Sequence, residues 1–343
     1  EYALSAEFTV AAGAATPVDL TTTAAGSTPA SMLGRSLVGV VGVPGAVVTA
    51  TGSTLFELDV DLEISADVSL GLTATSLNLG QGSAGAPQAW VNTATGILPY
   101  TIGSGLGTLN FGDTVSIGPV LSSGGFYSGS DVYGFFQTDG GLGGFRDVGA
   151  TGVAIDWLEN VDLSGLVTGR PVYSLAVDLD GEVKGYFATK LGAFKLDEGD
   201  LQGNYESVTE VFENADFFSV TIDGSPALIT NVAISGATLW IGTPRGVLTI
   251  PKATVGNVSK INADLVPGTR GLVTRRIAVG TNYQAILTDH IVFVRATGGS
   301  WKPFPVYAGV SGQVSGMFLD NANGIVLLAG DKGLSAFDIT AIP

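Results

Sequence analysis

A hairpin-like pattern recurs along the chain and constrains the fold more than any other feature. Each copy has two short runs rich in β-branched and aromatic residues, joined by a turn that usually contains Gly. The residue that closes the first run is Thr51, Thr93, Thr138, Thr189, Thr243 and Thr288, then Gly330. Copies are 42 residues apart at the closest (Thr51 to Thr93) and 54 at the widest (Thr189 to Thr243). Such a period is typical of propeller blades or helical repeats, and the strand-like composition favours the propeller.

Composition supports an all-β chain. Among 343 residues there are 50 Gly, 45% are hydrophobic and only 13% are charged, and no long stretch has helical spacing. This profile fits short strands joined by Gly-rich turns and argues against an α/β enzyme fold. The longest apolar run, at 37–52, is interrupted by Gly and Pro and is shorter than the roughly 20 residues of a spanning helix. We therefore expect no transmembrane segment.

The repeat predicts the architecture of the whole chain. Apolar runs at 172–178, 228–235, 274–280 and 314–320 precede hairpins and are interpreted as innermost strands, and the variable segment at 258–266 as an outermost strand. Four-stranded antiparallel sheets of this kind bury their faces by stacking around an axis. We predict one seven-bladed β-propeller domain over 1–343, with central hairpins at 48–59, 90–102, 135–147, 186–197, 240–251, 285–296 and 327–338. Another blade number, a sandwich or two smaller all-β domains are the alternatives.

The N-terminal segment is predicted to close the ring. The last hairpin ends shortly before Pro343, which leaves the final blade one strand short, and residues 5–12 alternate as a strand does. Residues 1–31 are therefore expected to supply the closing strand and a low-complexity tether. The tether composition favours an exported protein, periplasmic or extracellular, whose signal or lipid anchor has been removed.

Charge and residue types exclude several classes of partner and cofactor. The formal net charge is −16, from 31 acidic and 15 basic residues, which argues against nucleic acid and favours a soluble monomer. The chain has no Cys and a single His, so disulfides, thiolate metal sites and multi-histidine sites are excluded.

Basic residues are predicted to gather on one face of the propeller. The turns within the central hairpins and the connections between blades lie on the same face, around the mouth of the central channel. Seven residues fall in these segments and are here named the basic rim: Arg35, Arg170, Lys190, Arg245, Arg270, His290 and Lys332. In an otherwise acidic protein, this rim is a candidate site for an anionic small molecule or an acidic segment of a partner. The alternative is that these are solvated turn residues.

Calcium is considered only at 178–182, with the sequence DLDGE. Asp178, Asp180 and Glu182 alternate and carry the oxygen ligands that calcium prefers, but the segment lacks the length and distal Glu of an EF-hand loop. The segment DNANG at 320–324 occupies the equivalent place in the last repeat. This equivalence favours an Asx-type turn over a metal site, so no cofactor is predicted.

Catalytic patterns are weak. His290 has Asp289 beside it, but adjacent residues of a hairpin point in different directions, and no serine stands in an elbow motif. Strand aromatics recur at nearly one position, at Trp90, Phe136, Phe187 and Trp240, as packing between blades requires; a sugar-stacking platform is the alternative. Trp157 and Trp301 fall in predicted outer strands, where they could belong to a partner surface. No catalytic residue is predicted.

One hairpin resembles a known repeat. The segment LWIGTPRGVLTI at 239–250, preceded by VAISGAT, is similar to the blade motif of sensor-type propellers, the periplasmic ligand-sensing part of two-component regulators. The likeness covers one repeat well and the others loosely, and it implies the fold more than the activity.

We therefore expect an exported, non-catalytic binding or scaffolding propeller that recognises a protein partner or a small anionic ligand at the channel mouth. One alternative is a propeller hydrolase or lyase, with or without assistance from calcium. The other is a structural component of a surface assembly.

Overall fold

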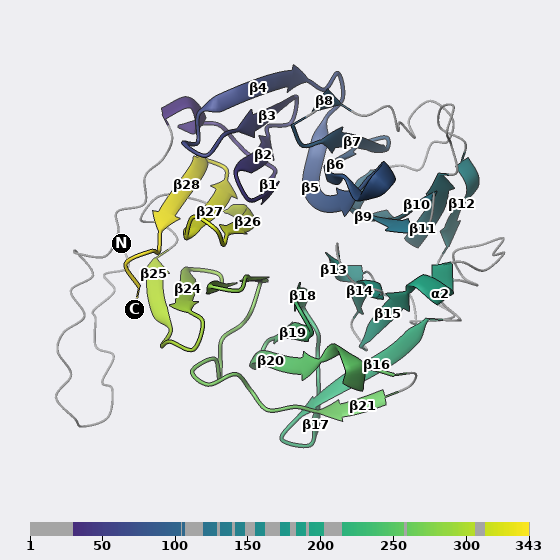
Figure 1. The fold of residues 1–343 in the computed structure, drawn as a ribbon, viewed down its shortest axis with the longest axis vertical. Helices are drawn as coiled ribbons and strands as arrows, with labels where there is room; N and C mark the ends of the chain where they lie inside the picture. The colour runs from purple at the N-terminus through teal and green to yellow at the C-terminus, as the bar shows by residue number, and fades with distance from the viewer. Residues whose placement is uncertain are drawn as a thin grey trace.

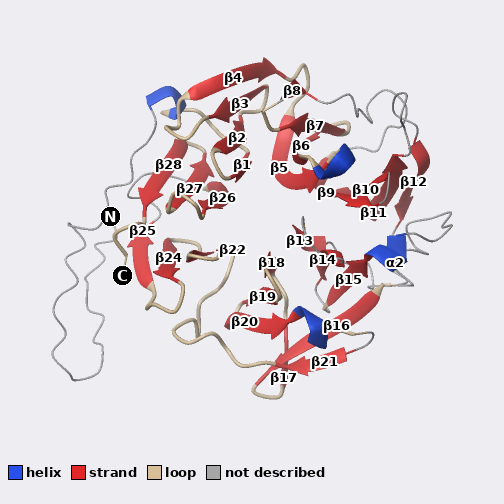
Figure 2. Cartoon of the chain, viewed as in Figure 1, coloured by secondary structure: helices blue, strands red, loops and turns tan. Residues whose placement is uncertain are grey.

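The chain forms a ring of small β-sheets in the computed structural model (Figure 1). The structure describes residues 30–103, 105–106, 119–128, 131–138, 141–147, 155–161, 172–178, 183–189, 192–201, 215–256, 259–305 and 313–342. Almost all regular structure in the described residues is strand, with a few short helical turns (Figure 2). Among the described residues, no helix has the length and apolar character needed to cross a bilayer.

The described residues of the first half of the chain form three antiparallel sheets. Each is built in chain order from the inside of the ring outward. The first contains β1 (Gly39–Val43), β2 (Ala46–Ala50), β3 (Thr54–Leu58) and β4 (Ile64–Ser69). The second contains β5 (Ala74–Gln81), β6 (Pro87–Thr93), β7 (Ile97–Thr101) and β8 (Gly105–Leu106). The third contains β9 (Val120–Ser128), β10 (Asp131–Thr138), β11 (Gly141–Asp147) and β12 (Ile155–Val161).

Four further sheets follow in the described residues. The fourth contains β13 (Val172–Val177), β14 (Val183–Thr189), β15 (Ala193–Asp197), β16 (Asp216–Ile222), β17 (Ser225–Ala227) and β21 (Ser259–Asn262). The fifth contains β18 (Asn231–Ser235), β19 (Thr238–Thr243) and β20 (Gly246–Pro251). The sixth contains β22 (Arg276–Val279), β23 (Tyr283–Leu287), β24 (Ile291–Ala296) and β25 (Lys302–Pro305). The seventh contains β26 (Val314–Asp320), β27 (Ile325–Gly330) and β28 (Gly333–Asp338).

Short helices connect some of these strands. They are η1 (Ala30–Met32), η2 (Ser83–Gly85), α2 (Glu198–Leu201) and η3 (Lys252–Thr254).

The described residues contain a pair of antiparallel strands at each of the seven hairpin positions, and the recurring threonine has a structural explanation. The second and third strands of every sheet pair in antiparallel register across the predicted turn. The threonine that ends the second strand donates its hydroxyl to the carbonyl three residues on, for example Thr93 to Gly96 (2.8 Å) and Thr243 to Gly246 (2.8 Å). Thr51, Thr189 and Thr288 do the same. The threonine therefore caps the turn.

The innermost strands contact one another around the whole ring. The contacts run from β1 through β5, β9, β13, β18, β22 and β26, and back to β1. Polar side chains join neighbouring inner strands: the Asn231 amide donates to Ser174 Oγ (3.0 Å) and accepts from Ile277 N (2.9 Å). Ser315 Oγ donates to Leu37 O (2.8 Å), which joins the last inner strand to the segment before the first. The fold is therefore the predicted β-propeller.

Two details of ring closure stay predictions. The closing strand expected at 5–12 lies outside the described residues, and so the described part of the seventh sheet has three strands. That the complete chain has seven blades also stays a prediction, with the seven sheets of the described residues as its basis.

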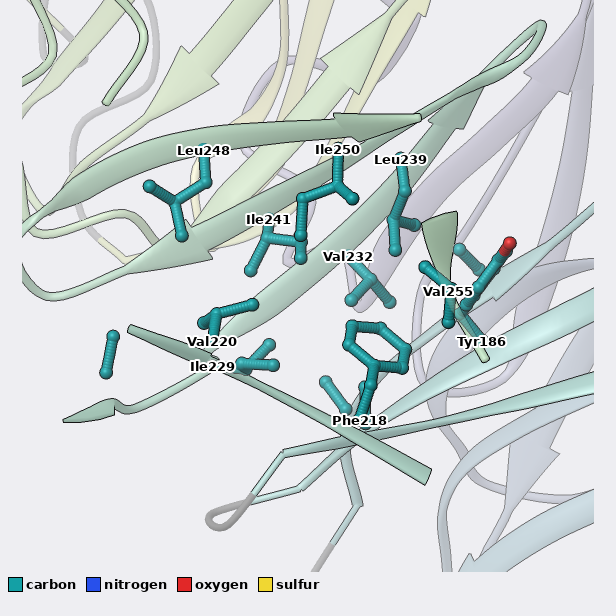
Figure 3. Packing of buried hydrophobic residues seen from close by; sticks show 14 of the residues in the cluster. Tyr186, Phe218, Val220, Ile229, Val232, Leu239, Ile241, Leu248, Ile250 and Val255 are labelled. Atoms are coloured by element: carbon teal, nitrogen blue, oxygen red, sulfur yellow. The ribbon is translucent and has the colours of Figure 1, made fainter. Parts of the chain in front are cut away.

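The hydrophobic core is divided among the junctions between sheets. A large cluster of the described residues lies between the fourth and fifth sheets and contains Tyr186, Phe218, Ile241 and Leu248, all fully buried (Figure 3). Similar clusters lie between the seventh and first, first and second, second and third, and sixth and seventh sheets. The predicted strand aromatics take part: Trp90, Phe136, Phe187 and Trp240 are between 0 and 6% exposed. Stacking of sheets thus supplies the burial that stabilises the ring.

The segment at 258–266 is not the outer strand of the fifth sheet, and that prediction was wrong. Its strand β21 pairs in parallel with β16 of the fourth sheet, from Phe218 with Ser259 to Thr221 with Asn262. β20 ends at Pro251, and η3 follows at once, which leads the chain away from the edge of the fifth sheet. Only an isolated bridge between Leu248 and Leu265 returns to that edge. In the described residues the fifth sheet consequently has three strands and the fourth has six.

Candidate binding face at the hairpin turns

Three of the described hairpin turns bond to the connections that lead into inner strands, which places these segments on one face of the ring. Gly271 N donates to Arg245 O (2.9 Å), and Gly34 N donates to Lys332 O (2.9 Å). Ala94 N likewise donates to Thr73 O (3.1 Å). In each pair a turn residue bonds to the connection that leads into an inner strand. We call this surface the turn face.

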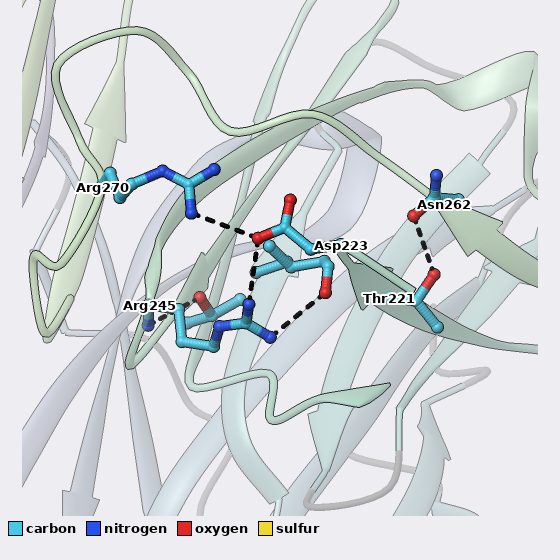
Figure 4. A network of polar contacts seen from close by, with 7 residues as sticks. Thr221, Asp223, Arg245, Asn262 and Arg270 are labelled. Atoms are coloured by element: carbon cyan, nitrogen blue, oxygen red, sulfur yellow. Dashed lines mark hydrogen bonds and ion pairs between the residues drawn. The ribbon is translucent and has the colours of Figure 1, made fainter. Parts of the chain in front are cut away.

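Two residues of the basic rim share one carboxylate. Arg245 Nη2 lies 3.2 Å from Asp223 Oδ2, and Arg270 Nη1 lies 3.1 Å from the same oxygen (Figure 4). Arg245 Nη1 also donates to Ile222 O (3.2 Å). The side chains are 41% exposed at Arg245, 70% at Arg270 and 59% at Asp223. The group therefore carries one net positive charge and has guanidinium nitrogens open to solvent.

The fourth sheet places Asp223 at this position. Asp223 and Gly224 form the two-residue turn between β16 and β17, and both have positive φ (50° and 74°), as in a type I′ hairpin. The hydrogen bond from Arg270, with the charge of that residue and of Arg245, lowers the pKa of the Asp223 carboxyl. Asp223 therefore stays ionised and holds the two arginines together. Sequence analysis missed this residue because the β16–β17 turn does not belong to the repeat.

Arg35 and Lys332 form a second part of the rim. The Arg35 guanidinium lies 4.6 Å from the centre of the Phe56 ring, and its Nε donates to Ser31 O (2.6 Å). Lys332 is exposed in the β27–β28 turn and is joined to this segment through the backbone at Gly34. The two cations thus come from the connection before the first sheet and the last hairpin turn, which meet where the ring closes.

His290 is exposed at the β23–β24 turn, apart from any catalytic arrangement in the described residues. The adjacent Asp289 accepts a hydrogen bond from Arg275 Nε (2.5 Å), which, with the charge of Arg275, lowers the pKa of this carboxyl. Asp289 is therefore paired with an arginine. The role of His290 in binding stays a prediction.

Arg276 adds a cation that sequence analysis did not single out. It is the first residue of the inner strand β22 and follows directly from the connection on the turn face. Arg276 is exposed to solvent, yet its Nη2 reaches Ser315 O of the neighbouring inner strand (3.3 Å), and desolvation by the surrounding protein lowers its pKa. Among the inner strands of the described residues, Asp320 is the only other charged residue. In the sequence, Arg276 could have been found as a charged residue at the start of a strand otherwise made of apolar residues.

Of the remaining predicted site residues, four lie outside the described residues: Arg170, Lys190, Asp180 and Glu182. Asp178 is buried and accepts a hydrogen bond from Lys252 Nζ (2.6 Å), an ion pair between the fourth and fifth sheets. Over the described part of the chain, no group of three or more His, Asp or Glu side chains could hold a metal ion.

The predicted Asx-type turn is present at the equivalent place in the seventh sheet. Asp320 Oδ1 accepts hydrogen bonds from Ala322 N and Asn323 N (both 3.1 Å). For Asp178 the following turn lies outside the described residues, so the calcium alternative there stays untested.

The two tryptophans predicted in outer strands are Trp157 and Trp301, and the structure gives side-chain contacts for Trp301. Trp157 lies in β12, the predicted outer strand of the third sheet. Trp301 comes just before β25; its Nε1 donates to Pro267 O (3.0 Å), and the Arg295 guanidinium lies 4.3 Å from its ring centre. Trp301 therefore has partners within the molecule.

The arrangement of sheets is that of the β-propeller class, and comparison with solved structures agrees. Cps50 (Swd1) from Myceliophteria thermophila has a β-propeller domain with a TM-score of 0.61 and 13% identity, over 92% of this chain and 100% of that one. The extracellular domain of the two component system BT4673 from B. thetaiotaomicron gives 0.58 and 12%, over 92% of this chain and 40% of that one.

PorZ of Porphyromonas gingivalis, a surface component of the type-IX secretion system, gives a TM-score of 0.54 and 15% identity, over 91% of this chain and 38% of that one. The chain thus spans about two fifths of the length of PorZ and of the BT4673 structure. No protein-family model matches the sequence, and no curated protein matches it. At these identities the likeness establishes the fold.

Proposed function

We propose that this protein is an exported, non-catalytic seven-bladed propeller whose turn face binds an anionic group, carried by a protein partner or by a small ligand. Its location is periplasmic or extracellular. Two of the similar structures support this setting, since one is a surface component of a secretion system and the other an extracellular domain of a two component system.

The observation that carries the proposal is the placement of fixed cations in a protein of net charge −16. Arg245 and Arg270 share Asp223, and Arg276 stands at the start of an inner strand on the same face. Three guanidinium groups against one carboxylate leave positive charge for a ligand. Guanidinium nitrogens bind carboxylates through paired hydrogen bonds.

The chemistry of these groups fits binding rather than catalysis. Arginine stays protonated at neutral pH and does not exchange a proton with a substrate. It supplies charge and hydrogen bonds in a fixed direction. The turn face therefore suits recognition of a carboxylate or phosphate.

A charged peptide provides the test. We would measure binding of a fluorescein-labelled oligoglutamate peptide to the full chain by fluorescence anisotropy at low and at physiological salt. Because the protein is itself strongly acidic, saturable binding requires a local cationic site. We expect Arg276→Gln, and separately Arg245→Gln, to weaken binding about tenfold, the worth of one or two charge-assisted hydrogen bonds.

The matched control is Lys302→Gln at an exposed position of the outer strand β25, which removes one charge away from the turn face. It is expected to leave affinity unchanged. Citrate added as competitor separates the two kinds of ligand: displacement at low concentration indicates a small-anion site, and resistance indicates an extended peptide surface. Equal affinity of the Lys302 and Arg276 variants would overturn the proposal.

A further inference from the structure

A cavity lies between the fifth and sixth sheets. Its volume is about 600 Å³, within the usual range for small-ligand sites. It is lined by Ser235 and Thr238 at the β18–β19 turn, and by Gly280 and Thr281 at the β22–β23 turn. These turns follow the inner strands, so the cavity is at the end of the sheets opposite the turn face. It is therefore distinct from the basic rim.

Arg295 is held in this cavity in a defined orientation. Its Nε donates to Gln284 Oε1 (2.6 Å), and its guanidinium lies 4.3 Å from the ring centre of Trp301 and 5.9 Å from that of Trp240. Trp301 is in turn fixed by its hydrogen bond to Pro267 O (3.0 Å). An arginine supported on an aromatic ring and bonded through one edge presents its other edge ready for a ligand.

The outer edge of this guanidinium has no hydrogen-bond partner among the described residues. No hydrogen bond or ion pair involves either Nη of Arg295 within the described part of the chain, although Asp264 also lines the cavity. Burial lowers the pKa of Arg295, but a guanidinium remains charged at neutral pH. A partly buried cation with two free donors is suited to a carboxylate bound through both oxygens.

The other walls supply hydroxyl groups and an aromatic edge. Thr238 and Thr249 lie on β19 and β20 beside Trp240, and their hydroxyls make no side-chain hydrogen bond to other described residues. Asp264 is exposed on the connection from the fourth sheet. Hydroxyl and carboxylate oxygens beside a tryptophan match a ligand with several hydroxyl groups and an apolar ring face.

We propose that this cavity binds a sugar acid, with the carboxylate on the Arg295 Nη pair and the hydroxyls toward Thr238, Thr249 and Asp264. The site does not depend on the basic rim. A free uronic acid and the terminal uronate of a longer saccharide share this chemistry.

Tryptophan fluorescence gives a direct test, because Trp240 and Trp301 both flank Arg295. We would titrate the full chain with D-glucuronate and D-galacturonate, and confirm affinities by calorimetry. D-Glucose lacks the carboxylate and acetate lacks the hydroxyls, so neither is expected to saturate the signal at the same concentrations. A methyl glycoside and a trisaccharide ending in uronate then distinguish the free acid from a chain end. Equal binding of glucose and uronates, or no binding by either uronate, would overturn the proposal.

Variants assign the binding to Arg295. We expect Arg295→Gln to weaken uronate binding about tenfold to a hundredfold, whereas Lys260→Gln, at an exposed position of β21 in the fourth sheet, leaves it unchanged. Circular dichroism and the thermal midpoint check that Arg295→Gln remains folded. If it does not, Thr238→Val and Thr249→Val test the hydroxyl contacts without altering the arginine, and each is expected to lower affinity about fivefold. Unchanged affinity in the folded variants would contradict the assignment.

Discussion

The fifth sheet has two very different sides. In β19, Leu239 and Ile241 pack toward the fourth sheet in a large apolar cluster, whereas Trp240 between them packs toward the sixth sheet. Alternate residues of a strand point to opposite faces, so one five-letter stretch, LWIGT, contributes to both junctions. On the first side aliphatic and aromatic side chains pack in one buried cluster, and on the second a smaller buried cluster that includes Trp240 leaves a cavity of about 600 Å³.

The two sides also treat charge differently. Toward the fourth sheet, Lys252 is paired with Asp178 (2.6 Å), and Lys195 with Asp216 (2.7 Å), with side chains between 9 and 24% exposed. Toward the sixth sheet, Arg295 lies on tryptophan rings and has Gln284, a neutral residue, as its hydrogen-bond partner. Charges on the first side are neutralised within the protein, while the charge on the second remains for a ligand.

The route of the chain after β20 accounts for this contrast. Because β21 adds to the fourth sheet, the fifth sheet has no regular fourth strand in the described residues. The irregular segment at 264–267 covers its edge instead and forms one wall of the cavity. A strand added on one side thus leaves an unfilled space on the other.

The largest expected effect on stability is at the junction between the fourth and fifth sheets. Ile241→Ala removes three carbon atoms from a fully buried position, and we expect a loss of about 3–4 kcal/mol in the free energy of unfolding. Urea unfolding followed by circular dichroism measures it. A loss below about 1 kcal/mol would show that this junction is as loosely packed as the other.

The buried ion pair comes next. Lys252→Ala leaves Asp178 buried without this partner, and we expect a loss of about 2–3 kcal/mol, reduced from the fully buried case because both side chains keep some exposure. The control is Arg270→Ala, whose side chain is 70% exposed in its pair; it should change stability far less. Similar urea midpoints for the two variants would show that the buried ion pair and the exposed ion pair contribute equally to stability.

A smaller effect on stability is expected at the junction between the fifth and sixth sheets, although Trp240 is a larger residue than Ile241. Trp240→Ala should cost about 2 kcal/mol, below the usual value for a core tryptophan, because the ring borders the cavity in addition to packing with Val247 and Ile277. The measurement is the same urea experiment as for Ile241→Ala. A loss greater than that of Ile241→Ala would show that the cavity side is the more tightly packed one.

The smallest expected effect is the pH dependence of stability that arises from Asp200, in the short helix α2 after β15. Burial raises the pKa of the Asp200 carboxyl to about 6, and the negative charge of Asp197 and Asp216 adds to this, although the hydrogen bond from Asp197 N opposes it. The folded state therefore holds this proton at a pH where the unfolded chain, with a pKa near about 4, has lost it. Stability falls as pH rises through this window, and the penalty is fully present above pH of about 6.

Asp200→Asn removes that titration while keeping an oxygen to accept from Asp197 N. We expect the variant to gain stability over the wild type at pH 7 and to lose this advantage at pH 4. Thermal midpoints at both pH values test it, and a constant difference between the two proteins across the range would contradict the assignment.

Sequence reasoning predicted what repeats and missed what does not. The period of the threonines predicted the hairpins, because each threonine caps its turn through a local hydrogen bond that needs only a three-residue spacing. The same reasoning placed Arg245 and Arg270 on one face, since connectivity decides which turns share a face. It did not find Asp223, or the pairing of β21 with β16, because these depend on contacts between residues about 20 to 50 positions apart.

The cavity escaped prediction for a related reason. Trp240 and Trp90 occupy the same place in their repeats, and both were interpreted as packing between blades. Trp90 is enclosed: it stacks on Phe145 (5.6 Å between ring centres), and a side-chain carbon on Gly125 would come within 2.0 Å of its ring. Trp240 faces Arg295 instead. What a strand residue meets depends on the neighbouring sheet, and the repeat pattern carries no information about that neighbour.

The pairing of β21 also has a consequence for the order in which the chain is completed during synthesis. The fourth sheet receives its last strand only after all three strands of the fifth sheet have been made, since residues 231–251 precede 259–262. A nascent chain that stops between them therefore exposes the edge of β16. We expect the fourth and fifth sheets to complete their folding in one cooperative step during synthesis, rather than one after the other.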